Sequence, residues 1–262
     1  MNAQRLKLLA VIFMTADHLG KILNSLYRYM EYGAEFDHYM NDNFWQMTVI
    51  GRLAFPIFCF LIAEGCAHTK NIKRYIGRLT VFAVISQIPY QMFHSAQIGF
   101  RNGRDFFFHF TSGNVLVTLA LGAAAVFFYQ KLFENGKLRL LNIFGIIAAT
   151  LALGFFRGEY GLYGFLIILP VYVFRKKEDV SPDFKVFGNK YIQVLCCTLA
   201  TLWYYMFTQH ESVYMVIGAV LSALPLLLYN KKPGSRKWKW AFYIYYPAHM
   251  LVLSAVMYVV ML

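Results

Sequence analysis

Long apolar runs recur along the whole chain and are separated by short polar connections. A helix of roughly 20 apolar residues spans about 30 Å of hydrocarbon, the thickness of a bilayer core. Such runs predict helices at residues 5–28, 44–67, 72–94, 113–133, 138–156, 160–175, 189–208, 212–229 and 240–261. The short sixth run follows the fifth closely, so these two are candidates for a hairpin or a broken pair. The pattern predicts an all-α polytopic membrane protein with about nine transmembrane helices.

The composition also favours a membrane protein. Hydrophobic residues make up 59% of the 262 residues and charged residues only 15%, which is more apolar surface than a soluble domain of this length can bury. No repeat, low-complexity tract or soluble domain interrupts the apolar runs, so residues 1–262 are predicted to form a single transmembrane domain. The four cysteines lie inside apolar runs without the paired spacing of a zinc site, and no metal site is predicted.

The basic residues are distributed unevenly among the connections. The net charge is +12, and the predicted topology places 19 of the 25 lysines and arginines in connections on one side of the membrane. Because short cytoplasmic loops carry the excess of Lys and Arg, the amino terminus is predicted to be cytoplasmic and the carboxyl terminus external. No basic domain or stripe is present, so the positive charge does not indicate nucleic-acid binding.

Two adjacent ionisable residues, Asp17 and His18, lie near the middle of the first apolar run. A charged side chain at the bilayer centre costs about 2.5 to 3.5 kcal/mol, so it normally faces a partner or a watery cavity. Asp17 is expected to pair with Lys21, one helical turn away, or with Arg52 in the second run. The two neighbours point about 100° apart on a helix, so Asp17 is poorly placed to orient the His18 ring. His18 is either a neutral imidazole bonded to a neighbouring helix or a general base tuned by burial.

Pro56 in the second apolar run predicts a bend. Proline lacks the backbone N–H that would bond to the carbonyl of Arg52, so the helix is expected to kink beside this charged side chain. A bent helix near the bilayer midplane favours a cavity at that depth.

A second group of charges lies where the second run ends and the third begins. Glu64 is near the inner end of the second run, and Arg74 and Arg78 share one face of the third. One interpretation is a Glu64–Arg78 ion pair. The other is that these arginines, with Lys70 and the loop from Lys231 to Lys239, receive the phosphates of a cytoplasmic anionic cofactor. Anionic lipid headgroups would fit the same charges.

Further polar residues lie in or beside the other apolar runs, and together they predict a polar seam across the membrane. The additional members of this seam are Asn114, Thr118, Glu159, Tyr160, Tyr229, Asn230 and His249. For His249 a packed, hydrogen-bonded core histidine and a functional residue are both compatible with the sequence. A row of polar residues that crosses the membrane suggests that a substrate or a chemical group is moved across it.

The motifs, in their order and spacing, resemble those of the TraX family of conjugal-transfer proteins. The resemblance extends to the transmembrane acyltransferases that include the acyltransferase-3 family and the lysosomal heparan glucosaminide acetyltransferase. It is carried by Asp17-His-x-Gly20, Gly-Arg52-x-Ala-Phe-Pro56, Glu64-Gly65, His68-Thr69, Tyr75-x-x-Arg78-Leu, Ser86-x-Ile-Pro89, Asn114-x-x-x-Thr118, Tyr160-Gly161, Tyr229-Asn230 and Tyr246-Pro-x-His249.

The resemblance implies acetyl transfer from cytoplasmic acetyl-CoA to an acceptor at the membrane. The founding activity of the family is the N-terminal acetylation of pilin, and the family's first-helix histidine maps to His18 as general base. The location implied is the bacterial inner membrane, in a multi-pass arrangement. The resemblance leaves three kinds of acceptor open: a peptide amino terminus such as that of a pilin-like peptide, a glycan, or a lipid. It also leaves open whether the protein forms a homo-oligomer.

The resulting hypothesis is an integral membrane acetyltransferase that acts on an amine or hydroxyl. Its expected catalytic residues are His18, Asp17, Arg52 and His249, its donor-binding residues Arg78, Arg74, Glu64, Tyr229, Asn230 and Lys239, and its acceptor-binding residues Asn114, Thr118, Glu159 and Tyr160. Direct transfer is favoured, because no Ser, Cys or Thr is visibly paired with a base. A second hypothesis is a proton-coupled transporter or flippase with Asp17, His18 and Glu64 as the relay. A third is an assembly subunit of a secretion complex.

Overall fold

The structure is a computed structural model that describes residues 1–32, 43–102, 112–134, 139–175, 189–208, 212–232, 234–235 and 238–261. Within these ranges all regular structure is helical, with no strand. The helices are α1 (Ala3–Tyr32), α2 (Trp45–Gly51), α3 (Ala54–His68), α4 (Ile72–Asn102), α5 (Val115–Glu134), α6 (Arg139–Phe155), α7 (Gly161–Val173), α8 (Lys190–Trp203), the π-helical turn η3 (Tyr204–Thr208), α9 (Val213–Val220), α10 (Ala223–Leu227) and α11 (Lys239–Met261).

Each predicted apolar run corresponds to one helix or to consecutive helices, so the all-α prediction is confirmed. The second run comprises α2 and α3, which are interrupted at Arg52 and Leu53. Pro56 is the third residue of α3, and the break therefore lies beside Arg52, where the proline predicts a bend. The seventh run comprises α8 and η3, and the eighth comprises α9 and α10.

Within the described ranges, three helical stretches are long and apolar enough to cross a membrane. These are Trp45–His68 in α2 and α3, Val115–Leu132 in α5, and Trp240–Val260 in α11. The stretches Arg139–Phe155, Gly161–Val173 and Val213–Leu227 are apolar but shorter. These helices indicate a membrane protein, whereas nine crossings and a cytoplasmic amino terminus stay predictions.

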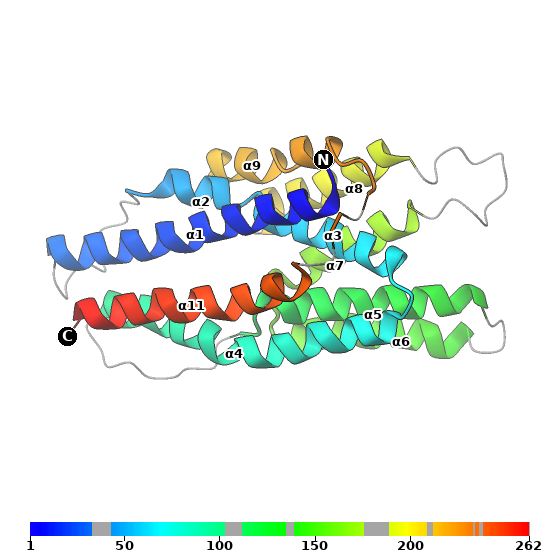
Figure 1. The fold of residues 1–262 in the computed structure, drawn as a ribbon, viewed down its shortest axis with the longest axis horizontal. Helices are drawn as coiled ribbons and strands as arrows, with labels where there is room; N and C mark the ends of the chain where they lie inside the picture. The colour runs from blue at the N-terminus through cyan, green and yellow to red at the C-terminus, as the bar shows by residue number, and fades with distance from the viewer. Residues whose placement is uncertain are drawn as a thin grey trace.

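Most helices lie roughly along the long axis of the molecule (Figure 1). Helix α1 packs against α2 and α3 on one side and against α4 and α11 on the other. The start of α1 is tied to the segment after α10, because the N–H of Ala3 donates to the carbonyl of Lys232 and the N–H of Asn230 donates to that of Met1. This packing buries the middle of α1, where Asp17 and His18 lie.

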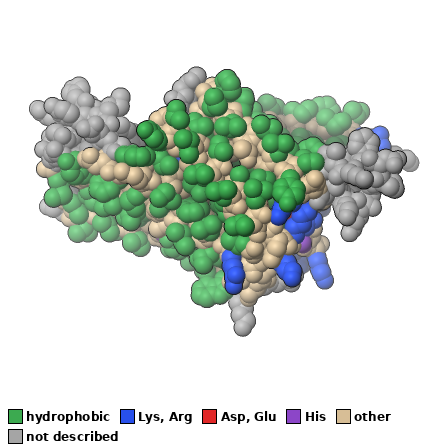
Figure 2. Space-filling model, turned by 90° about the horizontal axis from the view of Figure 1, so that it is seen from above, with side chains coloured by type: hydrophobic (Ala, Val, Ile, Leu, Met, Phe, Trp, Pro, Cys, Tyr) green, Lys and Arg blue, Asp and Glu red, His purple; other side chains and the backbone are tan. Residues whose placement is uncertain are grey.

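Large apolar side chains cover much of the outer surface. On α6, Leu140, Phe144, Leu151 and Phe155 are each more than 60% exposed. Figure 2 shows hydrophobic side chains spread over the visible face, whereas Lys and Arg gather in one part of it. Soluble monomers rarely expose contiguous apolar patches larger than a few hundred Å², so this surface is suited to contact with lipid.

Candidate functional site

The two buried histidines predicted separately from the sequence are hydrogen-bonded to each other. Nδ1 of His18 on α1 lies 2.7 Å from Nε2 of His249 on α11. Nδ1 of His249 lies 2.9 Å from the carbonyl oxygen of Tyr245, one turn earlier on α11. His18 thus bonds to a neighbouring helix, as one of its two interpretations expected, and its role as a base stays a prediction.

This chain of hydrogen bonds determines which ring nitrogen of His18 can act as a base. A carbonyl oxygen can only accept, so Nδ1 of His249 carries a proton, and in the neutral ring Nε2 is then an acceptor. Nδ1 of His18 must therefore donate to His249, which leaves Nε2 of neutral His18 unprotonated. In this tautomer, Nε2 of His18 is the ring nitrogen that can accept a proton.

Asp17 is held by a different partner. Its Oδ2 lies 2.6 Å from Nζ of Lys21, so the predicted ion pair one turn along α1 is confirmed. The same oxygen is 4.0 Å from His18 Nε2, which is too long for a hydrogen bond but close enough to stabilise a protonated ring. The other oxygen, Oδ1, is buried without a hydrogen-bond partner. Asp17 therefore has unused acceptor capacity next to the candidate base.

A small cavity of about 40 Å³ lies against these two residues. Its wall comes from α1, from the end of α2 and the first part of α3, from the start of α5, from the connection between α6 and α7, and from α11. The lining residues are Met14, Asp17, His18, Gly51, Ala54, Phe55, Phe58, Val115, Glu159, Tyr160 and Tyr246. A cavity of this size holds a few water molecules or a group as small as acetyl. In this cavity the predicted acceptor-binding residues Glu159 and Tyr160 lie together with the predicted catalytic residues Asp17 and His18.

The connection that carries Glu159 is held in an unusual backbone conformation. Arg157 and Tyr160 have positive φ angles of 45° and 65°, which non-glycine residues rarely adopt. The N–H of Glu159 donates to the carbonyl of Gly113 at 2.8 Å, and the hydroxyl of Thr118 donates to the carbonyl of Glu159 at 2.6 Å. Thr118 thus positions the connection from α5.

Asn114, predicted to bind the acceptor, also makes internal contacts. Its Oδ1 accepts from the N–H of Leu116 at 3.0 Å, and its Nδ2 donates to the carbonyl of Ala83 at 2.7 Å and to Gln87 at 2.8 Å. Asn114 and Thr118 are fully buried, and neither lines the cavity. The structure makes them supports of the cavity wall, and direct contact with an acceptor stays a prediction.

Arg52 lies at the interruption between α2 and α3. Its guanidinium carbon is 5.8 Å from the centre of the Tyr205 ring. It follows Gly51, which lines the cavity, but is itself absent from the lining. Arg52 is therefore next in sequence to a lining residue and does not itself line the cavity.

At Gly51, α2 approaches α1 closely. A Cβ atom at this position would overlap Cβ of Asp17. Gly51→Ala is therefore expected to displace α1 from α2 and to lower the free energy of unfolding by about 1 to 3 kcal/mol, the usual cost of overpacking. Thermal unfolding of the detergent-solubilised protein measures this. The matched control is Gly154→Ala on α6, because a Cβ there meets no atom within 4 Å. Equal midpoints for the two variants would contradict the close approach.

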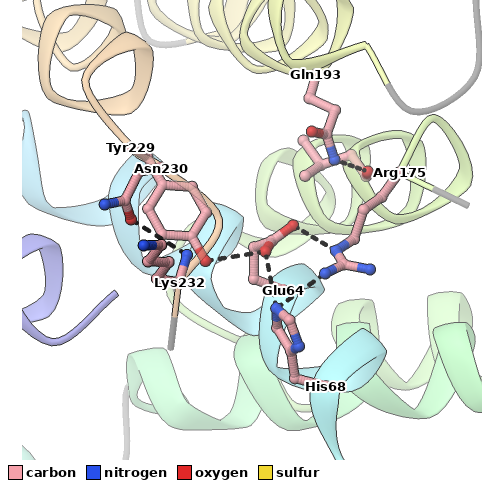
Figure 3. Close-up of polar contacts among 8 residues, drawn as sticks. Glu64, His68, Arg175, Gln193, Tyr229, Asn230 and Lys232 are labelled. Atoms are coloured by element: carbon pink, nitrogen blue, oxygen red, sulfur yellow. Dashed lines mark hydrogen bonds and ion pairs between the residues drawn. The ribbon is translucent and has the colours of Figure 1, made fainter. Parts of the chain in front are cut away.

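A second polar cluster surrounds Glu64 near the end of α3 (Figure 3). Glu64 Oε1 lies 2.6 Å from Nε of Arg175, and Oε2 accepts from the hydroxyl of Tyr229 at 3.0 Å and lies 3.5 Å from Nε2 of His68. Nη2 of Arg175 is also 2.9 Å from Nε2 of His68. The side chain of Glu64 is only 3% exposed. We call Glu64, His68, Arg175 and Tyr229 the Glu64 cluster.

The Glu64 cluster corrects one prediction. The ion-pair partner of Glu64 is Arg175, which follows α7, and not Arg78. The guanidinium carbon of Arg78 lies 5.8 Å from the Tyr75 ring, one turn earlier on α4. The sequence signal for this pair is the position of Arg175 at the inner end of an apolar run, on the predicted side of Glu64.

The remaining predicted donor residues are more dispersed. Asn230 accepts the N–H of Lys232 at 3.2 Å through its Oδ1, and Arg74 is exposed near the start of α4. Lys239 begins α11, but its side chain lies outside the described residues, as do parts of the predicted phosphate-binding loop. Among the described residues, no three His, Cys, Asp or Glu side chains gather as metal ligands.

Comparison with known proteins identifies relatives over nearly the whole length. A family profile described as TraX protein matches residues 2–257. A protein of Dichelobacter nodosus named "Probable fimbrial assembly protein FimC, serogroup H1" is 28% identical, over 97% of this chain and 95% of that protein. A protein of Rickettsia prowazekii (strain Madrid E) named "Uncharacterized protein RP591" is 28% identical over 50% of this chain and 40% of that protein. No solved structure matches the chain significantly.

Proposed function

This chain belongs to the TraX family, and from that premise we propose that it is an integral membrane acetyltransferase. It moves an acetyl group from cytoplasmic acetyl-CoA to an amine or hydroxyl of a membrane or extracytoplasmic acceptor. The relative named as a fimbrial assembly protein supports a pilin-like peptide as the acceptor. The observation that carries the proposal is His18, whose hydrogen bond to His249 leaves an unprotonated nitrogen beside a cavity of acetyl size.

The thioester supplies an activated carbonyl carbon: the acceptor nitrogen or oxygen bonds to it, the carbon–sulfur bond breaks, and the products are the acetylated acceptor and CoA thiol. His18 Nε2 removes the proton of the attacking group and returns it to the departing sulfur. His249 keeps His18 in the required tautomer through the 2.7 Å hydrogen bond. Asp17, 4.0 Å away, attracts the protonated ring, and the Lys21 ammonium bound to the same oxygen at 2.6 Å opposes that attraction.

The cavity wall supports direct transfer to the acceptor. None of the described residues that line the cavity is Ser, Cys or Thr, the side chains that form most acyl-enzymes. Its Asp17 and Glu159 carboxyl groups are suited to holding a polar acceptor near His18. The predicted catalytic role of Arg52, for which stabilisation of the developing oxyanion is the suitable chemistry, stays a prediction, because Arg52 does not line the cavity.

The proton-relay alternative has less support from the geometry. Glu64 lies six residues along α3 from Phe58, the nearest α3 residue of the cavity wall, which is about 9 Å at 1.5 Å per residue. Its carboxylate is bound to Arg175 and Tyr229, away from Asp17 and His18. A direct proton step between the two groups is therefore too long.

The test is acetyl transfer by the purified full-length protein in nanodiscs with acetyl-labelled acetyl-CoA. Acceptors are a peptide with a free α-amino group, the same peptide with that group blocked, and a hydroxyl-bearing glycan. We expect stoichiometric formation of CoA thiol and labelled acceptor, because transfer releases one thiol for each acetyl group. Absence of label from all acceptors and of thiol release would contradict the enzyme. Proton-gradient-driven flux in vesicles without CoA would instead support the transporter.

A further inference from the structure

A larger pocket, of about 390 Å³, lies where α3 turns into α4 and meets α5. Its volume falls within the range of about 300 to 1,000 Å³ that is typical of small-molecule sites. The lining residues are Cys66, Ala67, Thr69, Lys70, Asn71, Ile72, Lys73, Phe127, Gln130 and Lys131. We call it the lysine pocket, after Lys70, Lys73 and Lys131.

The lining of the lysine pocket combines positive charge with an aromatic ring. Three lysines and no Asp or Glu are among its described lining residues. Nζ of Lys73 lies 5.7 Å from the centre of the Phe127 ring. Ammonium groups bind phosphate oxygens through charge-assisted hydrogen bonds, and an aromatic face accepts a stacked nucleobase. This combination fits a phosphorylated nucleoside.

The distance from the candidate active site points to one such ligand. On helix α3, Phe58 in the cavity beside His18 and Cys66 in the lysine pocket are eight residues apart. On helix α5, Val115 in the cavity and Phe127 in the lysine pocket are twelve residues apart. These intervals are about 12 Å and about 18 Å at 1.5 Å per residue. About a dozen bonds separate the sulfur of CoA from its diphosphate, and they reach roughly 15 to 18 Å when extended.

We propose that the lysine pocket binds the adenosine phosphate end of acetyl-CoA, with Lys70, Lys73 and Lys131 on its phosphate groups and Phe127 beside the base. The proposal rests on the proposed acetyltransferase function, and it gives the donor a site distinct from the Glu64 cluster. The connections that carry the three lysines also lie on the side predicted to be cytoplasmic. From this pocket the pantetheine arm spans the interval along α3 and α5 to His18.

The test is binding by titration calorimetry with the full-length protein in nanodiscs of neutral lipid. The ligands are acetyl-CoA and acetylpantetheine, which lacks the nucleotide and its phosphates. Lys70→Ala, Lys73→Ala and Lys131→Ala are each expected to weaken acetyl-CoA binding about tenfold through the loss of a charge-assisted contact, and to leave acetylpantetheine binding within twofold. The matched control is Arg139→Ala, an exposed basic residue that does not line the pocket. Lys→Gln variants replace any Lys→Ala variant that fails to fold.

The outcomes separate this site from the function on which it rests. If wild type binds acetyl-CoA and the lysine variants bind it equally well, the lysine pocket is not the donor site, although the acetyltransferase stands. If folded wild type binds neither ligand, the acetyltransferase itself fails and the donor site with it. If the lysine variants instead lose bound phosphatidylglycerol in nanodiscs of anionic lipid, with acetyl-CoA binding unchanged, the pocket holds a lipid headgroup and the proposal is overturned.

Discussion

His18→Ala is expected to lower the rate of acetyl transfer by about 10²- to 10⁴-fold, the usual contribution of a general base. His18 is the imidazole that lines the cavity, and its hydrogen bond to His249 leaves Nε2 as the proton acceptor. Steady-state transfer from labelled acetyl-CoA measures the effect, with calorimetric binding of acetyl-CoA expected to be unchanged. A decrease smaller than tenfold in a folded variant would argue against the base role.

Two other histidine variants make this test specific. His94→Ala is the matched control, because His94 is a partly buried imidazole on α4 that stacks on Tyr90 and does not line the cavity. Its transfer rate should remain near that of wild type. His249→Phe keeps a ring but removes the acceptor for His18 Nδ1, so it should lower kcat, leave KM for the donor unchanged and move the pH–rate profile. An unaltered profile would show that His249 does not position the base.

Arg175→Ala is expected to lower the free energy of unfolding by about 3 to 5 kcal/mol, because it leaves the buried Glu64 carboxylate without its cation. The remaining contacts, from Tyr229 at 3.0 Å and His68 at 3.5 Å, do not replace a 2.6 Å ion pair. Unfolding by denaturing detergent, followed by circular dichroism, measures the change. Arg139→Ala, on the exposed start of α6, is the control for loss of a positive charge.

The double variant Glu64→Leu with Arg175→Leu distinguishes the ion pair from the volume of its side chains. Removing both charges leaves no unpaired buried charge, so the double variant should be more stable than Arg175→Ala alone. If Arg175→Ala unfolds at the same denaturant concentration as wild type, the Glu64 cluster does not hold the end of α3 to the end of α7.

The helices themselves follow from local patterns in the sequence. Runs of apolar residues predict each helical segment, and the break beside Arg52 follows from Pro56, because a proline affects the carbonyl one turn before it. The Asp17–Lys21 pair is also local, since residues four apart share a helix face. The same reasoning identified Asp17, His18, Glu64 and His249 as candidates, because polar side chains within apolar runs need partners.

Contacts between distant parts of the chain were not accessible in this way. The partner of His18 is 231 residues away in sequence, and the partner of Glu64 is 111 residues away. Asn114 and Thr118 look like seam residues in the sequence, but Asn114 is hydrogen-bonded to Ala83 on α4, and Thr118 to the connection that carries Glu159. The lysine pocket likewise joins the turn before α4 to the end of α5.

The sequence by itself therefore determined that this protein is helical and apolar, where its helices lie, and which buried polar residues need an explanation. The tertiary structure alone decided that His18 meets His249, that Arg175 rather than Arg78 neutralises Glu64, and that Glu159 and Asp17 line the same small cavity. The physical reason is the distance along the sequence over which each kind of interaction acts. Helix formation and one-turn pairs depend on neighbours within about four residues, whereas the facing of helices depends on how all of them pack together.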